Sequence, residues 1–207
     1  MPGSDALAFF GGVCAAVSHE LKNVLAVINE QAGLLGDLSC MAARGMPLDP
    51  DRLAAVAACL QKQVCRGDAI LTDVSRFAHT ADPAPRSLPL GEAACLAVSL
   101  CQRRAAMRQV ALTATPDSAA LVTGEAFALV RLVALCLERA MDAPDAAKAV
   151  AVAATDAPDG PTLTVSGMAA DAALADDDPL RALAAAQGAR LDVVPGGLTL
   201  TWQGERG

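Results

Sequence analysis

The chain has 207 residues, of which 54% are apolar, 2% aromatic and 19% charged, and its net charge at pH 7 is −7. A chain this apolar buries a core, which excludes intrinsic disorder, and its length allows one domain or two small ones. The acidic balance and the scarcity of aromatic rings exclude a basic phosphate-binding surface and a base-stacking platform. We therefore expect no nucleic-acid partner.

The patterns of charged residues and cysteines indicate where in the cell the protein is located. Charged residues interrupt every apolar stretch before it reaches the ~20 residues of a transmembrane helix, so we expect no membrane association. The N-terminus lacks the positively charged start of a secretory signal. The seven cysteines show no CxxC spacing and fall mostly in helical patterns, which indicates reduced thiols. These features predict a cytoplasmic protein.

The first 85 residues carry two helical patterns. The first pattern, from residue 4 to 39, predicts one long helix with a narrow inward stripe. Its apolar positions alternate in steps of four and three, at Phe10, Cys14, Val17, Leu21, Val24, Ile28, Leu35 and Leu38, with Gln31 as the one polar member. After a break at residues 42–47, Asp49-Pro50-Asp51 predicts the start of a second helix that ends before residue 82. We expect an antiparallel hairpin that forms a four-helix bundle in a homodimer, because two helices alone enclose little core.

Beyond Pro85 the spacing of apolar residues alternates between that of a helix and that of a strand. Helices are predicted over residues 92–108, 125–141 and 180–187. Strands are predicted over residues 110–115, 121–122, 148–154, 162–166, 191–194 and 198–202. This order predicts a two-layer α/β sandwich. The predicted fold class is therefore α+β, with a helical hairpin domain over residues 1–85 and an α/β domain over residues 86–207.

The first helix carries a histidine in a setting that suits phosphoryl chemistry. On the heptad, His19 falls on the outer face; Glu20 flanks it, Lys22 lies three residues on, and Asn23 follows one turn later. A neutral imidazole is a nucleophile near pH 7. Glu20 is a candidate to take the proton or hold the tautomer, and Asn23 to orient a phosphoryl oxygen or a water. The same geometry also fits an ordinary solvated histidine.

The local sequence Ser18-His19-Glu20-Leu21-Lys22-Asn23, followed by Val24-Leu25-Ala26-Val27-Ile28, resembles the phospho-acceptor box of two-component histidine kinases. It lies where that family has it, on the first helix of a dimerising hairpin, and departs at Val24, where the family often has proline. The resemblance implies that His19 is the phosphorylated residue. It also implies that Glu20 and Asn23 form the E-x-x-N element used in phosphotransfer and dephosphorylation.

Residues 86–207 resemble, more weakly, the GHKL-type ATPase domain of the same kinases. Residues 129–143 are similar to the helix that carries the N-box, but Arg139 stands where the family has a Mg²⁺-binding asparagine. Residues 162–169 align with the strand ending in the D-x-G-x-G box, but Gly167 replaces the aspartate that reads adenine. Residues 170–180 leave no room for the usual ATP lid. The resemblance thus implies the scaffold without its nucleotide chemistry, and we expect the chain to bind no cofactor or metal.

Three functions follow as hypotheses. The first is a phosphorelay histidine phosphotransferase that passes a phosphoryl group between receiver-domain aspartates through His19 without ATP. Its partners would be response-regulator receivers, with a hybrid kinase receiver as one candidate, and the receiver would supply Mg²⁺. The second is a divergent histidine kinase core that autophosphorylates His19. The third is a non-catalytic binding module, or a phosphatase, acting on a response regulator.

Overall fold

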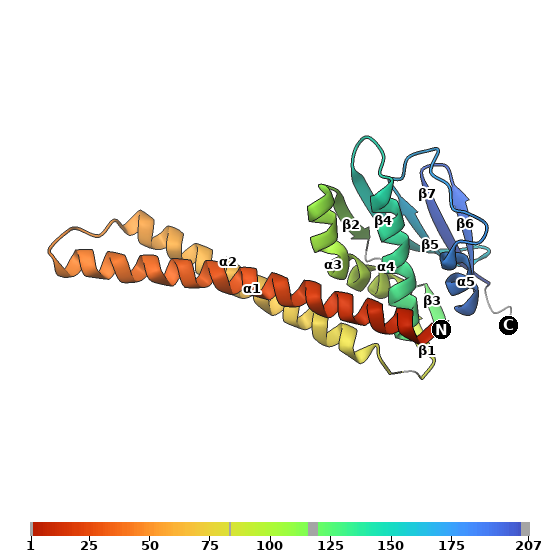
Figure 1. Ribbon diagram of the computed structural model, residues 1–207, viewed down its shortest axis with the longest axis horizontal. Helices are drawn as coiled ribbons and strands as arrows, with labels where there is room; N and C mark the ends of the chain where they lie inside the picture. Colours follow the sequence, from red (N-terminus) through yellow and green to blue (C-terminus); the bar gives the residue numbers. More distant parts are fainter. Residues whose placement is uncertain (1, 83, 116–119, 204–207) are drawn as a thin grey trace. The chain divides into compact units, whose positions relative to one another are not determined.

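The computed structural model describes residues 2–82, 84–115 and 120–203 (Figure 1). Its internal contacts divide the chain into two compact units. One unit, which we call the hairpin unit, spans residues 10–75, and the other, the α/β unit, combines residues 1–9 with residues 76–207. Residues 2–9 and 76–79, which belong to the two long helices, are thus part of the α/β unit, whereas a functional boundary at residue 85 stays a prediction.

Two long helices form the hairpin, α1 (Pro2–Ala43) and α2 (Pro50–His79). The start of α2 is capped as the sequence predicts, since the Asp49 carboxylate accepts a hydrogen bond from the Asp51 amide at 3.0 Å. The inward stripe of α1 agrees in part with the predicted one: Val24 and Leu38 are buried as predicted. At its N-terminal end Val13 is buried instead of its neighbour Cys14, which is exposed.

The α/β unit has a five-stranded sheet in the order β2-β4-β5-β7-β6. Strand β2 pairs in parallel with β4, and the other neighbours pair antiparallel. The strands are β2 (Ala111–Thr115), β4 (Ala149–Ala157), β5 (Gly160–Ser166), β6 (Ala189–Val194) and β7 (Gly197–Trp202). A separate ribbon joins β1 (Arg86–Pro89) antiparallel to β3 (Leu121–Gly124). The predicted two-layer α/β sandwich is confirmed, with β1 as an element that the sequence did not reveal.

Three helices cover one face of this sheet: α3 (Leu90–Arg108), α4 (Ala126–Asp142) and α5 (Pro179–Ala186) (Figure 1). Leucines and valines on alternate strand positions face the helices, which is why β4 and β7 alternate between buried and partly exposed residues. No helix among the described residues is both long and apolar enough to span a bilayer.

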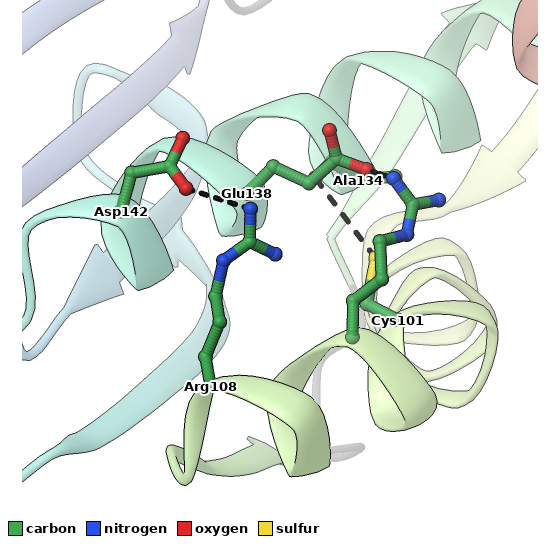
Figure 2. A network of polar contacts seen from close by, with 6 residues as sticks. Cys101, Arg108, Ala134, Glu138 and Asp142 are labelled. Atoms are coloured by element: carbon green, nitrogen blue, oxygen red, sulfur yellow. Dashed lines mark hydrogen bonds and ion pairs between the residues drawn. The ribbon is translucent and has the colours of Figure 1, made fainter.

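Ion pairs and a buried thiol connect α3 and α4 (Figure 2). Arg108 pairs with Asp142 at 2.7 Å, and Arg104 pairs with Glu138. Below them the buried Cys101 thiol approaches the Ala134 carbonyl oxygen at 4.0 Å. Arg104 and Arg108 of α3 therefore join these two helices.

The rings of Phe9, Phe77 and Phe127 meet in one cluster within the α/β unit. The rings of Phe9 and Phe77 lie 6.0 Å apart, and each lies within 6.0 Å of Phe127 at the start of α4. Offset and edge-to-face ring pairs at this spacing are favourable. The cluster explains why the first residues of α1 and the last of α2 belong to the α/β unit.

Candidate phosphoryl-acceptor site and the nucleotide-domain scaffold

The predicted acceptor lies in the middle of an unbroken stretch of α1. The helix runs from Pro2 to Ala43, and no proline follows Pro2 within it. His19, Lys22 and Asn23 are all exposed. Their side chains are therefore accessible to a partner from outside the hairpin.

Glu20 differs from its three neighbours because it faces α2. Its side chain is 22% exposed, and its Oε1 accepts a hydrogen bond from Nη2 of Arg66 at 2.8 Å. Among the described residues, no hydrogen bond or ion pair joins His19 to Glu20, Lys22 or Asn23. The structure thus brings Glu20 together with Arg66, and leaves the His19 ring without a direct contact to either.

A second contact fixes the register of the two helices at this level. Gly67 faces α1 so closely that an added Cβ would lie 3.5 Å from a methyl carbon of Val24, which is itself buried. Arg66 therefore stands level with the turn from Glu20 to Val24, which also contains Asn23. The sequence does not reveal Arg66 as part of the site, because its partner Glu20 lies 46 residues earlier and no local pattern connects the two positions.

The other candidate site is on α4 of the α/β unit. Nη2 of Arg139 pairs with Oδ2 of Asp178 at 2.8 Å, and Oδ1 of Asp178 accepts a hydrogen bond from the Leu180 amide at 2.9 Å. Asp178 is thereby the N-cap of α5 and almost fully buried. Its two neighbours in the acidic run, Asp176 and Asp177, are exposed.

This ion pair changes the chemistry of the position. A guanidinium has only donors and cannot ligate Mg²⁺, which requires oxygen ligands. The nearby Cys136 thiol is buried, which raises its pKa from 9.0 to about 12; the Asp178 charge adds to the rise and the Arg139 charge opposes it. Among the described residues, no group of three His, Cys, Asp or Glu side chains is placed to hold a metal ion.

Gly167, at the end of β5, is held by backbone geometry that excludes a side chain. Its φ is +94°, and an added Cβ would overlap the carbonyl oxygen of Ala149. Its amide and that of Met168 both donate to the Gly196 carbonyl oxygen at 3.0 Å. An aspartate cannot occupy this position without moving the strand.

A cavity of about 800 Å³ lies in the α/β unit beside α4 and α5. Apolar side chains make up much of its lining, which includes Phe9, Leu135 and Leu183, and Arg131, Arg139 and Asp178 also line it. Both oxygens of Asp178 are engaged, one by Arg139 and one by the Leu180 amide. The carboxylates of Asp5, Glu138 and Asp142 line the same cavity.

No protein-family model and no curated protein sequence matches the chain. Among solved structures, a bacterial phosphotransferase superposes with a TM-score of 0.51 at 14% identity, over 94% of this chain and 95% of that one. The histidine kinase AdeS of Acinetobacter baumannii gives a TM-score of 0.47 at 10% identity, over 91% of this chain and 98% of that one. The chain thus shares its fold with the phosphotransferase, a helical hairpin followed by an α/β domain.

One further similar structure is a histidine kinase, ThkA, in complex with the response regulator protein TrrA. It superposes with a TM-score of 0.44 at 11% identity, over 95% of this chain and 62% of that one. At these identities the similarity concerns the fold.

Proposed function

We propose that this chain is a histidine phosphotransferase, which passes a phosphoryl group between receiver-domain aspartates through His19 and does not use ATP. The observation that carries the proposal is the exposure of His19 on α1, with Lys22 and Asn23 exposed beside it. A phosphoryl group on a partner's aspartate needs an accessible nucleophile, and within the hairpin unit, residues 10–75, the one imidazole is at this position.

The transfer step balances without a co-reactant. A lone pair on one imidazole nitrogen of His19 forms the N–P bond while the P–O bond to the receiver aspartate breaks, and the aspartate leaves as a carboxylate. The proton on the other ring nitrogen passes to solvent. In the second transfer the N–P bond breaks, the carboxylate of another receiver takes the phosphoryl group, and the ring regains its proton.

The neighbouring residues act through position and charge. Lys22 brings a positive charge to the phosphoryl oxygens, and Asn23 donates a hydrogen bond to one of them. Glu20 and Asn23 together are the E-x-x-N element that the resemblance implies. Phosphoryl transfer depends mainly on positioning and charge stabilisation, so an exposed helix with these groups is sufficient when the receiver supplies Mg²⁺.

Two features of the α/β unit favour transfer without ATP over autophosphorylation. Arg139 is bound to Asp178 where the resemblance places a metal-binding asparagine, and Gly167 leaves no space for an adenine-reading aspartate. The kinase reading remains the principal alternative, since the acceptor box resembles that of histidine kinases. The partners that we propose are response-regulator receivers and a second copy of this chain.

A radiolabel transfer assay tests the proposal. The wild-type protein, His19→Ala and His79→Ala are each incubated with labelled ATP, and separately with labelled phospho-receiver domains. His79 is the matched control because it is the only other histidine. We expect label from the receiver on the wild type and on His79→Ala, and no label on His19→Ala.

The other outcomes separate the alternatives. Label that arrives from ATP alone would identify a kinase and overturn the proposal. Loss of label from the receiver as inorganic phosphate, with none retained on His19, would identify a phosphatase. A stable complex with the receiver that survives His19→Ala without transfer would identify a binding module.

A further inference from the structure

Arg66 lies on the same side of the hairpin as His19. A helix turns about 100° per residue, so Arg66 points about 160° away from the exposed Val64 on α2, and His19 about 120° away from the exposed Leu25 on α1. Both residues therefore point away from the exposed apolar side of the hairpin. The Glu20–Arg66 pair and the Val24–Gly67 contact place them at the same level along the helices.

The guanidinium of Arg66 has donors to spare. Its side chain is 53% exposed, and within the described part of the chain its polar contact is a single Nη2–Oε1 bond to Glu20. A guanidinium carries five N–H donors in a fixed plane, which leaves the second amino group and Nε for another anion. Exposed ion pairs contribute little to the free energy of folding, so the protein does not need the Glu20–Arg66 pair in order to fold.

We propose that Arg66 is a phosphoryl-binding residue of the His19 site and that Glu20 holds it in place. The inference rests on the proposed function. It adds a charged donor from α2 to the groups on α1, so that the phosphoryl group lies between Arg66 and Asn23 while it is bonded to His19. Glu20 then acts through Arg66 as a positioning residue, which accounts for its carboxylate facing α2.

The electrostatic reason is the charge that the phosphoryl group carries during and after transfer. Its equatorial oxygens share negative charge, and charge-assisted hydrogen bonds from a fixed guanidinium stabilise it more than neutral donors do. Glu20 also prevents the long arginine side chain from sampling other rotamers. Two anions, the carboxylate and the phosphoryl group, can share one guanidinium because its two edges are separate.

The test uses the full chain and potassium phosphoramidate, a small donor that phosphorylates His19 without receiver docking. The variants are Arg66→Gln, Arg66→Lys and Glu20→Gln, with Arg52→Gln as the matched control because Arg52 is also an exposed arginine on α2. We expect Arg66→Gln to slow phosphorylation roughly tenfold, Arg66→Lys to recover most of the rate, and Glu20→Gln to fall between them. Arg52→Gln should match the wild type.

A spectroscopic readout separates binding from a structural role. In ³¹P NMR of the phosphorylated protein, a nearby guanidinium favours the dianionic phosphoryl group. The second phosphoryl ionisation should therefore occur at higher pH in Arg66→Gln than in the wild type, and should not move in Arg52→Gln. The inference is overturned if Arg66→Gln phosphorylates at the wild-type rate, or if this ionisation does not move.

The two proposals fail differently. If receivers transfer nothing to the wild type but the Arg66 effects appear with phosphoramidate, the phosphotransferase proposal fails and the phosphoryl-binding role of Arg66 holds. If receivers transfer normally and the Arg66 variants behave as the wild type, only the role of Arg66 fails.

Discussion

At the scale of single residues, Gly167 has the clearest structural requirement. Its positive φ and the nearby Ala149 carbonyl leave no room for a Cβ. We expect Gly167→Ala to lower the free energy of unfolding by about 1–3 kcal/mol, measured by urea denaturation. Gly33→Ala is the control: Gly33 lies within α1 with nothing near an added Cβ, so the substitution should stabilise by roughly 0.5–1 kcal/mol. Equal stability of the two variants would contradict this account of Gly167.

Cys136 predicts a pH dependence of stability. Burial raises its pKa from 9.0 to about 12, with Asp178 adding to the rise. Above pH 9 the unfolded thiol loses its proton while the folded thiol keeps it, so stability falls from pH 9 to about pH 12. At pH 10 the loss from this thiol is on the order of 1 kcal/mol relative to pH 8. Urea unfolding at both pH values should show a smaller loss for Cys136→Ala, while Cys40→Ala, an exposed cysteine, should keep the wild-type loss. An unchanged loss in Cys136→Ala would refute the assignment.

At the scale of elements, Asp178 joins α5 to α4 through its two carboxylate oxygens. One caps α5 and the other pairs with Arg139. We expect Asp178→Ala to cost about 1–2 kcal/mol, from the lost cap and an unpaired arginine, whereas the exposed neighbour Asp177→Ala should cost under about 0.5 kcal/mol. In a double-mutant cycle, Arg139→Ala should lower the free energy of unfolding less in the Asp178→Ala background than in the wild type. The effects of substitutions at two residues in contact are not additive. Additive losses would mean that the pair contributes nothing.

The elements also show what the sequence could and could not reveal. The long helices and the sheet strands were predictable because apolar positions repeat with the period of each structure. Strand β1 was not, because its four residues, Arg86–Pro89, carry too short a pattern and it pairs with a strand more than 30 residues later. Exposure of His19 followed from the heptad, whereas the partnership of Glu20 with Arg66 depends on the register between two helices, which no local pattern encodes.

At the scale of the whole molecule, the hairpin unit has large apolar side chains that this single chain does not bury. Leu25 is 62% exposed, Val64 60% and Leu71 56%. Leu21, Ile28 and Leu35 are partly exposed. On α1, Cys14, Leu21, Leu25, Ile28 and Leu35 recur in steps of seven, four, three and seven, which is a second heptad stripe beside the one that contacts α2. Contiguous exposed apolar surface of this kind marks an interaction site.

The periodicity favours a second copy of the same hairpin as the partner, because identical stripes can pack knobs into holes about a two-fold axis. We expect the wild type to behave as a dimer in light scattering coupled to size exclusion, at twice the 20.9 kDa chain mass. Leu25→Asp and Val64→Asp should each shift it toward the monomer, because each puts two charges, one from each copy, into a dry interface. Leu121→Asp is the control: Leu121 is 54% exposed on β3, so this variant should stay dimeric. A wild type that runs at the single-chain mass at tens of micromolar would refute the dimer, and dissociation of all three variants alike would place the interface elsewhere.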